Sequence, residues 1–133
     1  MVIDTSAIMA AISGEPDAPL YREAIKSADI SLLSAVTMLE TQIVLFARIG
    51  ATAVTAFHEL IEKTPIVIVP FDEMLAAAAF AAYRTYGKGR GHAAQLNIID
   101  CTAYALARSR GLPLLFKGND FARTDAISAL GPA

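Results

Sequence analysis

Short apolar runs alternate along the chain with longer stretches in which apolar residues recur every three or four positions. The short runs predict buried strands, and the longer stretches predict helices. The expected strands cover residues 1–3, 30–33, 66–69 and 114–116. The expected helices cover residues 5–12, 16–27, 34–49, 52–63, 72–86 and 97–110. Continuous apolar strands that are separated by helices are typical of a parallel sheet covered on both faces, so we predict an α/β fold. No linker or repeat divides the sequence, which predicts one domain over residues 1–133.

The charge balance gives no global basic field, since the formal net charge is −2. Seven of the eleven basic residues nevertheless fall in the last fifty positions, which predicts either a local basic surface or ordinary solvated helix faces. The single cysteine, Cys101, excludes an internal disulfide. No signal stretch opens the chain, and no apolar run reaches the ~20 residues that a bilayer requires. We therefore expect a cytoplasmic protein without a membrane segment.

Four acidic side chains lie inside or beside apolar segments, where an unpaired charge is costly. They are Asp4, Glu40, Asp100 and Asp120. Each has a purely structural explanation. Asp4 and Asp120 can cap helical turns, and Glu40 can pair with a buried arginine. Asp100 follows Asn97 by three residues, so the two can form a capping box. The other acids stand in hydrophilic surroundings, where solvated faces and helix caps are expected.

The predicted fold brings these acids toward one rim of the sheet. Asp4 leaves the carboxyl end of the first strand, and Asp120 follows the last strand. Asp100 lies in the first turn of a helix that begins at the same rim, whereas Glu40 joins only if its helix turns that face inward. Clustered carboxylates take up protons or cations because they repel one another. Oxygen ligands without Cys or paired His favour Mg²⁺ or Mn²⁺, and phosphodiester hydrolysis suits such a site.

Four segments carry a resemblance to a known family, in its order and spacing. They are MVIDTSA at the amino end, SAVTMLET around Glu40, KGRGHAAQLNIIDCTAYALA around Asp100, and PLLFKGNDFARTD around Asp120. In these segments the chain resembles the PIN-domain ribonucleases and, within them, the VapC-type toxins of type II toxin–antitoxin modules. The resemblance implies a PIN fold, with four or five parallel strands and helices on both faces. It also implies an Mg²⁺- or Mn²⁺-dependent endoribonuclease that cleaves structured RNA such as tRNA or rRNA.

The resemblance further implies partners and residue roles. The partners are a second copy in a homodimer and a VapB-type antitoxin, whose own DNA-binding domain makes any contact with DNA indirect. The catalytic and metal-binding quartet matches Asp4, Glu40, Asp100 and Asp120, with Asp4 and Asp100 as the main ligands. Supporting candidates are Ser6, Asn97 and Asp125, and helix capping explains Ser6 and Asn97 equally well. We expect RNA contacts from Lys88, Arg90, His92, Lys117 and Arg123, with a loop anchor as the alternative role of His92.

Three other functions fit a parallel sheet with acids at its rim. A phosphoacceptor signalling domain requires an acidic pair after the first strand, where Asp4 stands alone. A small phosphatase requires a second acid two residues later, where Ser6 stands. A catalytically silent binding module keeps the fold without binding metal. The apolar hairpin over residues 37–61 is either core packing or a combination of dimer seam and antitoxin groove.

Overall fold

Four parallel strands form the centre of the molecule in the computed structural model, which describes residues 1–132. In chain order they are β1 (Val2–Ile3), β2 (Ser31–Ser34), β3 (Ile66–Val69) and β4 (Leu114–Leu115). Their order across the sheet is β3-β2-β1-β4, and all pairings are parallel. Ser128 adds one isolated parallel bridge to Leu114. The predicted parallel sheet and the positions of its strands are confirmed.

Within residues 1–132, six α-helices lie between these strands in the chain, and one short 3₁₀-helix follows the last strand. They are α1 (Thr5–Ile12), α2 (Ala18–Ser27), α3 (Ala35–Arg48), α4 (Ala51–Lys63), α5 (Glu73–Tyr86), α6 (Ile98–Arg110) and η1 (Phe121–Arg123). The predicted helix at 16–27 starts two residues later, because residues 16 and 17 form a turn. Pro19 then lies in the first turn of α2, where its missing N–H has no helical acceptor to lose. Gly111 ends α6 in the left-handed conformation, with φ of 63°.

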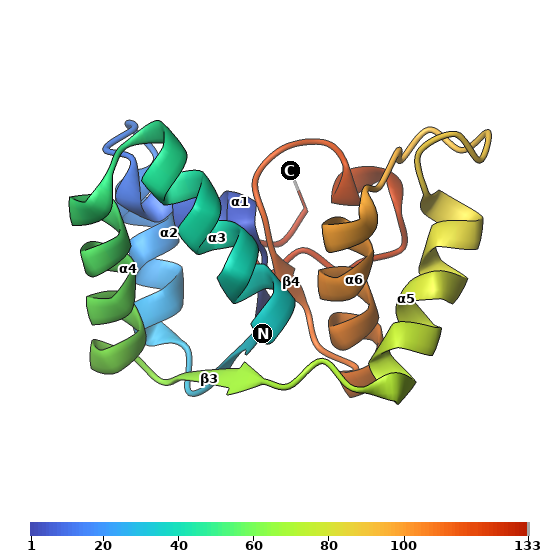
Figure 1. Cartoon of the computed structure of the whole chain (residues 1–133), viewed down its shortest axis with the longest axis horizontal. Helices are drawn as coiled ribbons and strands as arrows, with labels where there is room; N and C mark the ends of the chain where they lie inside the picture. Colours follow the sequence, from blue (N-terminus) through green and yellow to red (C-terminus); the bar gives the residue numbers. More distant parts are fainter. Residues whose placement is uncertain (133) are drawn as a thin grey trace.

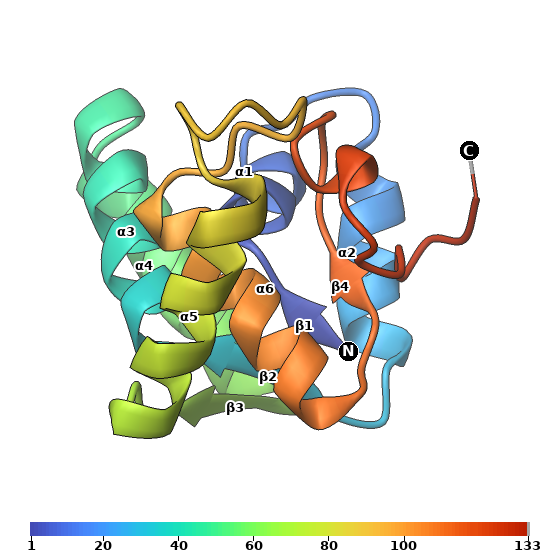
Figure 2. The same cartoon turned by 90° about the vertical axis from the view of Figure 1, so that its right-hand side faces the viewer.

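Helices cover both faces of the sheet, because successive residues of each strand point in opposite directions. Val2 and Leu114 pack on one face with α5 and α6. Ile3 and Leu115 pack on the other face with α1, α2, α3 and α4. The two views show this division, with α5 and α6 to one side of the strands and the first four helices to the other (Figures 1 and 2).

The strand order reverses beside β1. From β1 the chain steps outward to β2 and then β3, and it returns across the sheet to form β4 on the opposite side of β1. Open parallel sheets bind ligands at the carboxyl ends of the strands next to such a reversal. Asp4 directly follows β1, and its backbone N–H donates to the carbonyl of Leu115 at 3.0 Å. The topology therefore places Asp4 at the expected position of a site.

Within residues 1–132, no helix combines the length and the apolar character that crossing a membrane requires.

Candidate active site

One cleft, of about 440 Å³, collects all four of the acids that the sequence singled out. Asp4 reaches it from the end of β1, and Glu40 from α3. Asp100 comes from the first turn of α6, and Asp120 from the loop between β4 and η1. Ser6 and Asn97 line the same cleft. Segments separated by up to 116 positions thus meet at the carboxyl rim of the sheet, as the pattern of strands and acids predicts.

Asp4 is the most deeply buried of these acids, with 4% of its surface exposed. Its Oδ2 accepts the backbone N–H of Ser6 at 3.0 Å and the Ser6 hydroxyl at 2.7 Å. Asp4 is therefore the N-cap of α1, but the cap uses only one carboxylate oxygen. Its Oδ1 is buried without a hydrogen-bond partner. Burial raises the pKa of Asp4, and the charge of Glu40 raises it further.

Asp100 combines a capping role with a place in the cleft. Its Oδ2 accepts the backbone N–H of Asn97 at 3.0 Å, while Oδ1 of Asn97 accepts the backbone N–H of Asp100 at 2.8 Å. This capping box orients the carboxylate at the start of α6. Burial raises the pKa of Asp100 to about 7, and the charges of Asp4, Asp120 and Glu40 add to the shift. Asp100 therefore both caps α6 and lines the acidic cleft, so the two explanations that the sequence left open do not exclude each other.

Glu40 and Asp120 have no structural partner among residues 1–132. Glu40 forms no ion pair there, so its explanation as the partner of a buried arginine is wrong. Asp120 precedes η1 but makes no side-chain capping bond, so its capping explanation is wrong as well. Packing explains why Glu40 faces the cleft: Thr41 is fully buried and its hydroxyl donates to that of Thr5 at 3.2 Å. This contact fixes the rotation of α3 against α1.

The donor set of the cleft fits a hard divalent cation such as Mg²⁺ or Mn²⁺. Among its lining residues the side chains that can donate an electron pair are carboxylates, an amide and hydroxyls, with the Met9 thioether as the one sulfur and no Cys or His. The unpartnered Oδ1 of Asp4 is a buried acceptor that a cation would satisfy. Within the described residues, however, no three acidic, His or Cys side chains stand at ready-made metal-ligand spacing. Closer approach of these carboxylates would require a cation to offset their mutual repulsion.

The expected RNA-binding residues divide into anchored and free side chains. The ammonium group of Lys117 lines the cleft but pairs with Asp17 at 2.8 Å and with Glu15. Arg123 donates to the carbonyl of Ala93 at 3.1 Å, which ties η1 to the glycine-rich loop. The anchoring role of His92 is observed too. Its Nδ1 accepts the N–H of Ala94 at 3.0 Å, and its ring meets Tyr86 edge-on at 4.8 Å between centroids.

The side chains of Lys88 and Arg90 are exposed and make no ion pair within residues 1–132. They stand on the loop between α5 and α6, at the end of the molecule where α6 begins (Figure 1). These two cations remain available to a ligand.

Arg48 lines the cleft and was missed by the sequence analysis. A signal was present: Glu40, Val44 and Arg48 follow one another at intervals of four on α3, and residues so spaced share one helix face. All three line the cleft. Glu15 also lies at its edge, although its hydrophilic surroundings indicated an ordinary solvated acid.

Asp125, which was expected to support the site, does not line this cleft. It lines a separate hollow of about 80 Å³ beside the end of α6, together with Arg108 and Gly111. The hydroxyl of Tyr104 donates to Asp125 and lowers its pKa, and Arg108 lies 3.7 Å away. The chain turns at η1 and runs back along α6. Asp125 therefore lines a different hollow from Asp120, although only five positions separate the two residues in sequence.

Comparison with known proteins matches this geometry to a family. The PIN domain family matches residues 1–127 of the chain. Ribonuclease VapC28 of Mycobacterium tuberculosis is 46% identical over 130 residues, which cover 98% of this chain and 98% of that protein. The chain belongs to the VapC group of the PIN domain family. The resemblance carried by the four sequence segments is thereby confirmed.

Two solved structures share the fold. VapC20 of Mycobacterium tuberculosis, a sarcin-ricin loop cleaving toxin, has a TM-score of 0.77 and 18% identity, with coverage of 95% of each chain. A toxin–antitoxin complex from Klebsiella pneumoniae has a TM-score of 0.68 and 19% identity, covering 91% of this chain and 89% of that one. The predicted PIN fold of this VapC chain is confirmed.

Proposed function

We propose that this VapC protein is a divalent-metal-dependent endoribonuclease, with Asp4, Glu40, Asp100 and Asp120 as its catalytic acids. The observation that carries the proposal is the convergence of these acids on one cleft of a PIN fold. Support comes from relatives that cover nearly the whole chain and are named ribonucleases, such as VapC28 at 46% identity. A catalytically silent module would not require Glu40 and Asp120 to line this cleft without a structural partner among residues 1–132.

In this proposal the chain supplies ligands and a proton acceptor. Asp4, whose Oδ1 is unpartnered, and Asp100 would hold the cation, Mg²⁺ or Mn²⁺. When bound, such an ion supplies positive charge that acidifies water and stabilises charge developing on a phosphate. Ser6 fixes the orientation of Asp4, and Asn97 fixes that of Asp100. The carboxylates of Glu40 and Asp120 carry no structural bond, so they are free to accept the proton of the attacking water.

The proposed substrate is structured RNA, such as tRNA or rRNA, cut where its bases are unpaired. Lys88 and Arg90 are exposed cations on the loop that precedes α6, whose first turn lines the cleft. They suit contacts with phosphates that flank the scissile one. Unpaired loops expose base edges and backbone together, whereas a regular A-form duplex hides its major groove. The structural neighbour VapC20 is a sarcin-ricin loop cleaving toxin.

Two protein partners belong to the proposal. The first is a VapB-type antitoxin in the cytoplasm, in line with a structural neighbour that is a toxin–antitoxin complex. An antitoxin arginine entering the acidic cleft would compete with metal by pairing bidentately with a carboxylate. Contact with DNA would then occur through the antitoxin alone.

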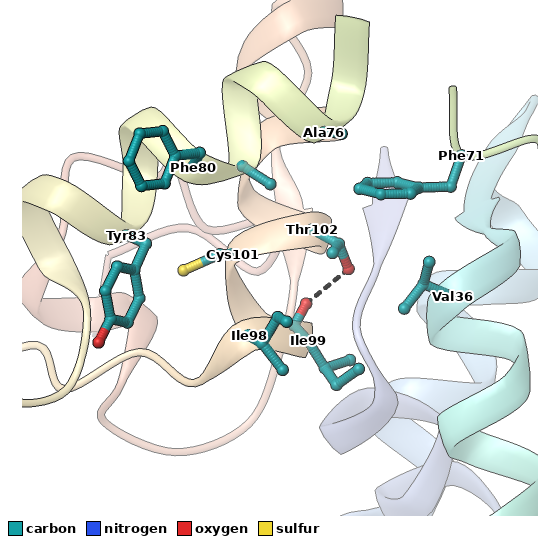
Figure 3. Close-up of a pocket in the computed structure, with 10 residues that line it drawn as sticks. Val36, Phe71, Ala76, Phe80, Tyr83, Ile98, Ile99, Cys101 and Thr102 are labelled. Carbon is teal, nitrogen blue, oxygen red and sulfur yellow. Dashed lines mark hydrogen bonds between the residues drawn. The ribbon is translucent and has the colours of Figure 1, made fainter. Parts of the chain in front are cut away.

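The second partner is another copy of this chain. An apolar hollow of about 580 Å³ lies between α3 and the pair α5–α6, and its walls include Val36, Phe71 and Phe80 (Figure 3). Phe80 is 64% exposed beside it, and Leu39, Ile43 and Phe46 of α3 are each more than half exposed. The hairpin over residues 37–61 therefore divides its apolar residues between core and surface, since Leu45 and Phe57 are fully buried. Large exposed apolar side chains beside an apolar hollow suit an interface.

Purified protein incubated with total RNA, with and without Mn²⁺, tests the nuclease proposal when new 5′ ends are mapped. We expect a small set of Mn²⁺-dependent ends that vanish with the Asp4→Asn variant. Cleavage by that variant at the wild-type rate would contradict the proposal. Calorimetric titration with Mn²⁺ separates an inactive enzyme from a silent scaffold, because a scaffold has no reason to bind the ion.

A further inference from the structure

Arg48 ends the row of residues that α3 presents to the cleft. The row is Glu40, Val44 and Arg48, and α3 ends at Arg48 itself. Eight residues at 1.5 Å each separate Glu40 from Arg48 by about 12 Å along the helix axis. The guanidinium therefore stands at the edge of the acidic cleft, two turns away from the carboxylate of Glu40.

Arg48 and Lys117, the two cations that line the cleft, differ in their ion pairing. Lys117 forms ion pairs with Asp17 and Glu15. No carboxylate among residues 1–132 lies within ion-pairing distance of Arg48, although five acids line the same cleft. An arginine that is exposed beside acids and still unpaired keeps all five guanidinium N–H donors for a ligand.

We propose that Arg48 binds a substrate phosphate that neighbours the scissile one. The proposal deepens the nuclease function and rests on it. In the proposed function the reacting phosphate would lie at the acids, and the offset of about 12 Å assigns Arg48 the next part of the backbone. Its planar guanidinium matches two phosphate oxygens at once, which an ammonium group does not.

The geometry also gives the bound RNA a path. The end of α3 and the loop that carries Lys88 and Arg90 lie at the same end of the molecule, on opposite sides of it (Figure 1). RNA that contacts both must cross the acidic cleft between them. Arg48 and the loop cations thus hold the backbone on either side of the scissile position, while Lys117 stays engaged with its two acids.

A structural role for Arg48 predicts different behaviour. A positive charge in the last turn of α3 also interacts favourably with the helix dipole. Loss of that interaction alone lowers the melting temperature slightly and leaves RNA affinity and its salt dependence unchanged. The test must therefore measure binding as well as stability.

The experiment uses the full chain and a fluorescein-labelled RNA hairpin with an unpaired loop, in EDTA so that no cleavage occurs. The dissociation constant is measured by anisotropy over a series of KCl concentrations. The proteins are wild type, Arg48→Ala, Arg48→Lys, and the control Arg110→Ala, which removes an exposed arginine at the far end of α6. Each protein is first shown to melt cooperatively.

We expect Arg48→Ala to weaken binding about tenfold and to reduce the slope of log K against log[salt] by about 0.7, the value for one single-strand phosphate contact. Arg48→Lys should keep the slope and recover only part of the affinity, and Arg110→Ala should match wild type. An Arg48→Ala protein that matches Arg110→Ala in both quantities overturns the inference, as does a wild type that fails to bind the hairpin. If wild type binds with the expected slope but total RNA stays intact with Mn²⁺, the nuclease proposal fails and the phosphate contact stands.

Discussion

The hydroxyl of Ser6 donates a hydrogen bond of 2.7 Å to Oδ2 of Asp4, and this bond has a fixed direction. The same hydroxyl oxygen accepts the backbone N–H of Lys117 at 3.0 Å, so its single proton is directed to the carboxylate. The end of β4 and the end of β1 are thereby joined through one side chain. Oδ1 of Asp4 is left as the free oxygen of that carboxylate.

Replacement of Ser6 by Ala should slow RNA cleavage at fixed Mn²⁺ by about 10- to 100-fold, the usual effect of losing a residue that orients a metal ligand. The variant removes one donor to Asp4 and the acceptor of the Lys117 N–H. The matched control is Ser6→Thr, which keeps the hydroxyl and should stay within a few-fold of wild type. Equal rates for the Ala and Thr variants would show that the hydroxyl has no positioning role.

Asp120 and Asp125 provide a matched pair of aspartates five positions apart, one inside the cleft and one outside it. Asp120→Asn should reduce cleavage by at least about 100-fold, because it removes an unpaired carboxylate from the site. Asp125→Asn should leave cleavage within about twofold, since its carboxylate bonds Tyr104. A loss of activity in the Asp125 variant comparable to that of Asp120→Asn would show that both acids take part in catalysis. That result would contradict the assignment of Asp125 to a separate hollow.

Metal-free protein should lose stability as the pH rises from about 5 to 8. The pKa of Asp100 is about 7 in the folded chain against an ordinary 3.8, so the folded state binds more protons in this range than the unfolded state does. Stability from this group is present at low pH and disappears as the pH passes the folded pKa. The raised pKa of Asp4 acts in the same direction.

Melting temperatures in EDTA at pH 5.5 and pH 8 measure this effect. We expect a lower value at pH 8, a smaller drop for Asp100→Asn, and recovery on adding Mn²⁺ at pH 8 but little recovery at pH 5.5, where protons compete with the ion. A melting temperature that rises with pH in EDTA, for wild type and variant alike, would contradict the account of Asp100.

The proposed dimer gives a prediction for the exposed apolar face. Phe80→Arg places a charge at the hollow between α3 and α5, and a buried unpaired charge prevents association. Light scattering should give wild type a mass of twice 14.1 kDa and the variant the mass of a single chain. Leu20→Arg is the control, because Leu20 is 53% exposed on α2, on the other face of the sheet. A wild-type monomer, or a variant that remains dimeric, would argue against this interface.

The strands and the most buried acids were predictable from sequence because each leaves a local signal. A strand buried on both faces is usually apolar throughout, as Val2–Ile3 and Leu114–Leu115 are. Asp4 and Asp100 stand out because charge within apolar sequence requires a special reason. For both residues the sequence also allowed a helix cap, and each acid does cap its helix while facing the cleft.

The remaining site features depend on packing that the sequence does not contain. The rotation of α3, which decides whether Glu40 faces the cleft, is set by the buried contact of Thr41 with Thr5, 36 positions away. Lys117 was expected to be free for RNA, but its partner Glu15 lies 102 positions earlier. Arg48 was overlooked because a basic residue in a last helical turn is typical of any solvated helix.

Calorimetric titration of the metal-free protein with Mn²⁺ at pH 8 tests the central claim, which is that acids from four separate segments build one cation site. We predict a saturable binding isotherm for wild type and its loss in both Asp4→Asn and Asp100→Asn, with cooperative melting retained in each variant. Wild-type titrations that show only heats of dilution, or variants that bind Mn²⁺ as wild type does, would contradict it.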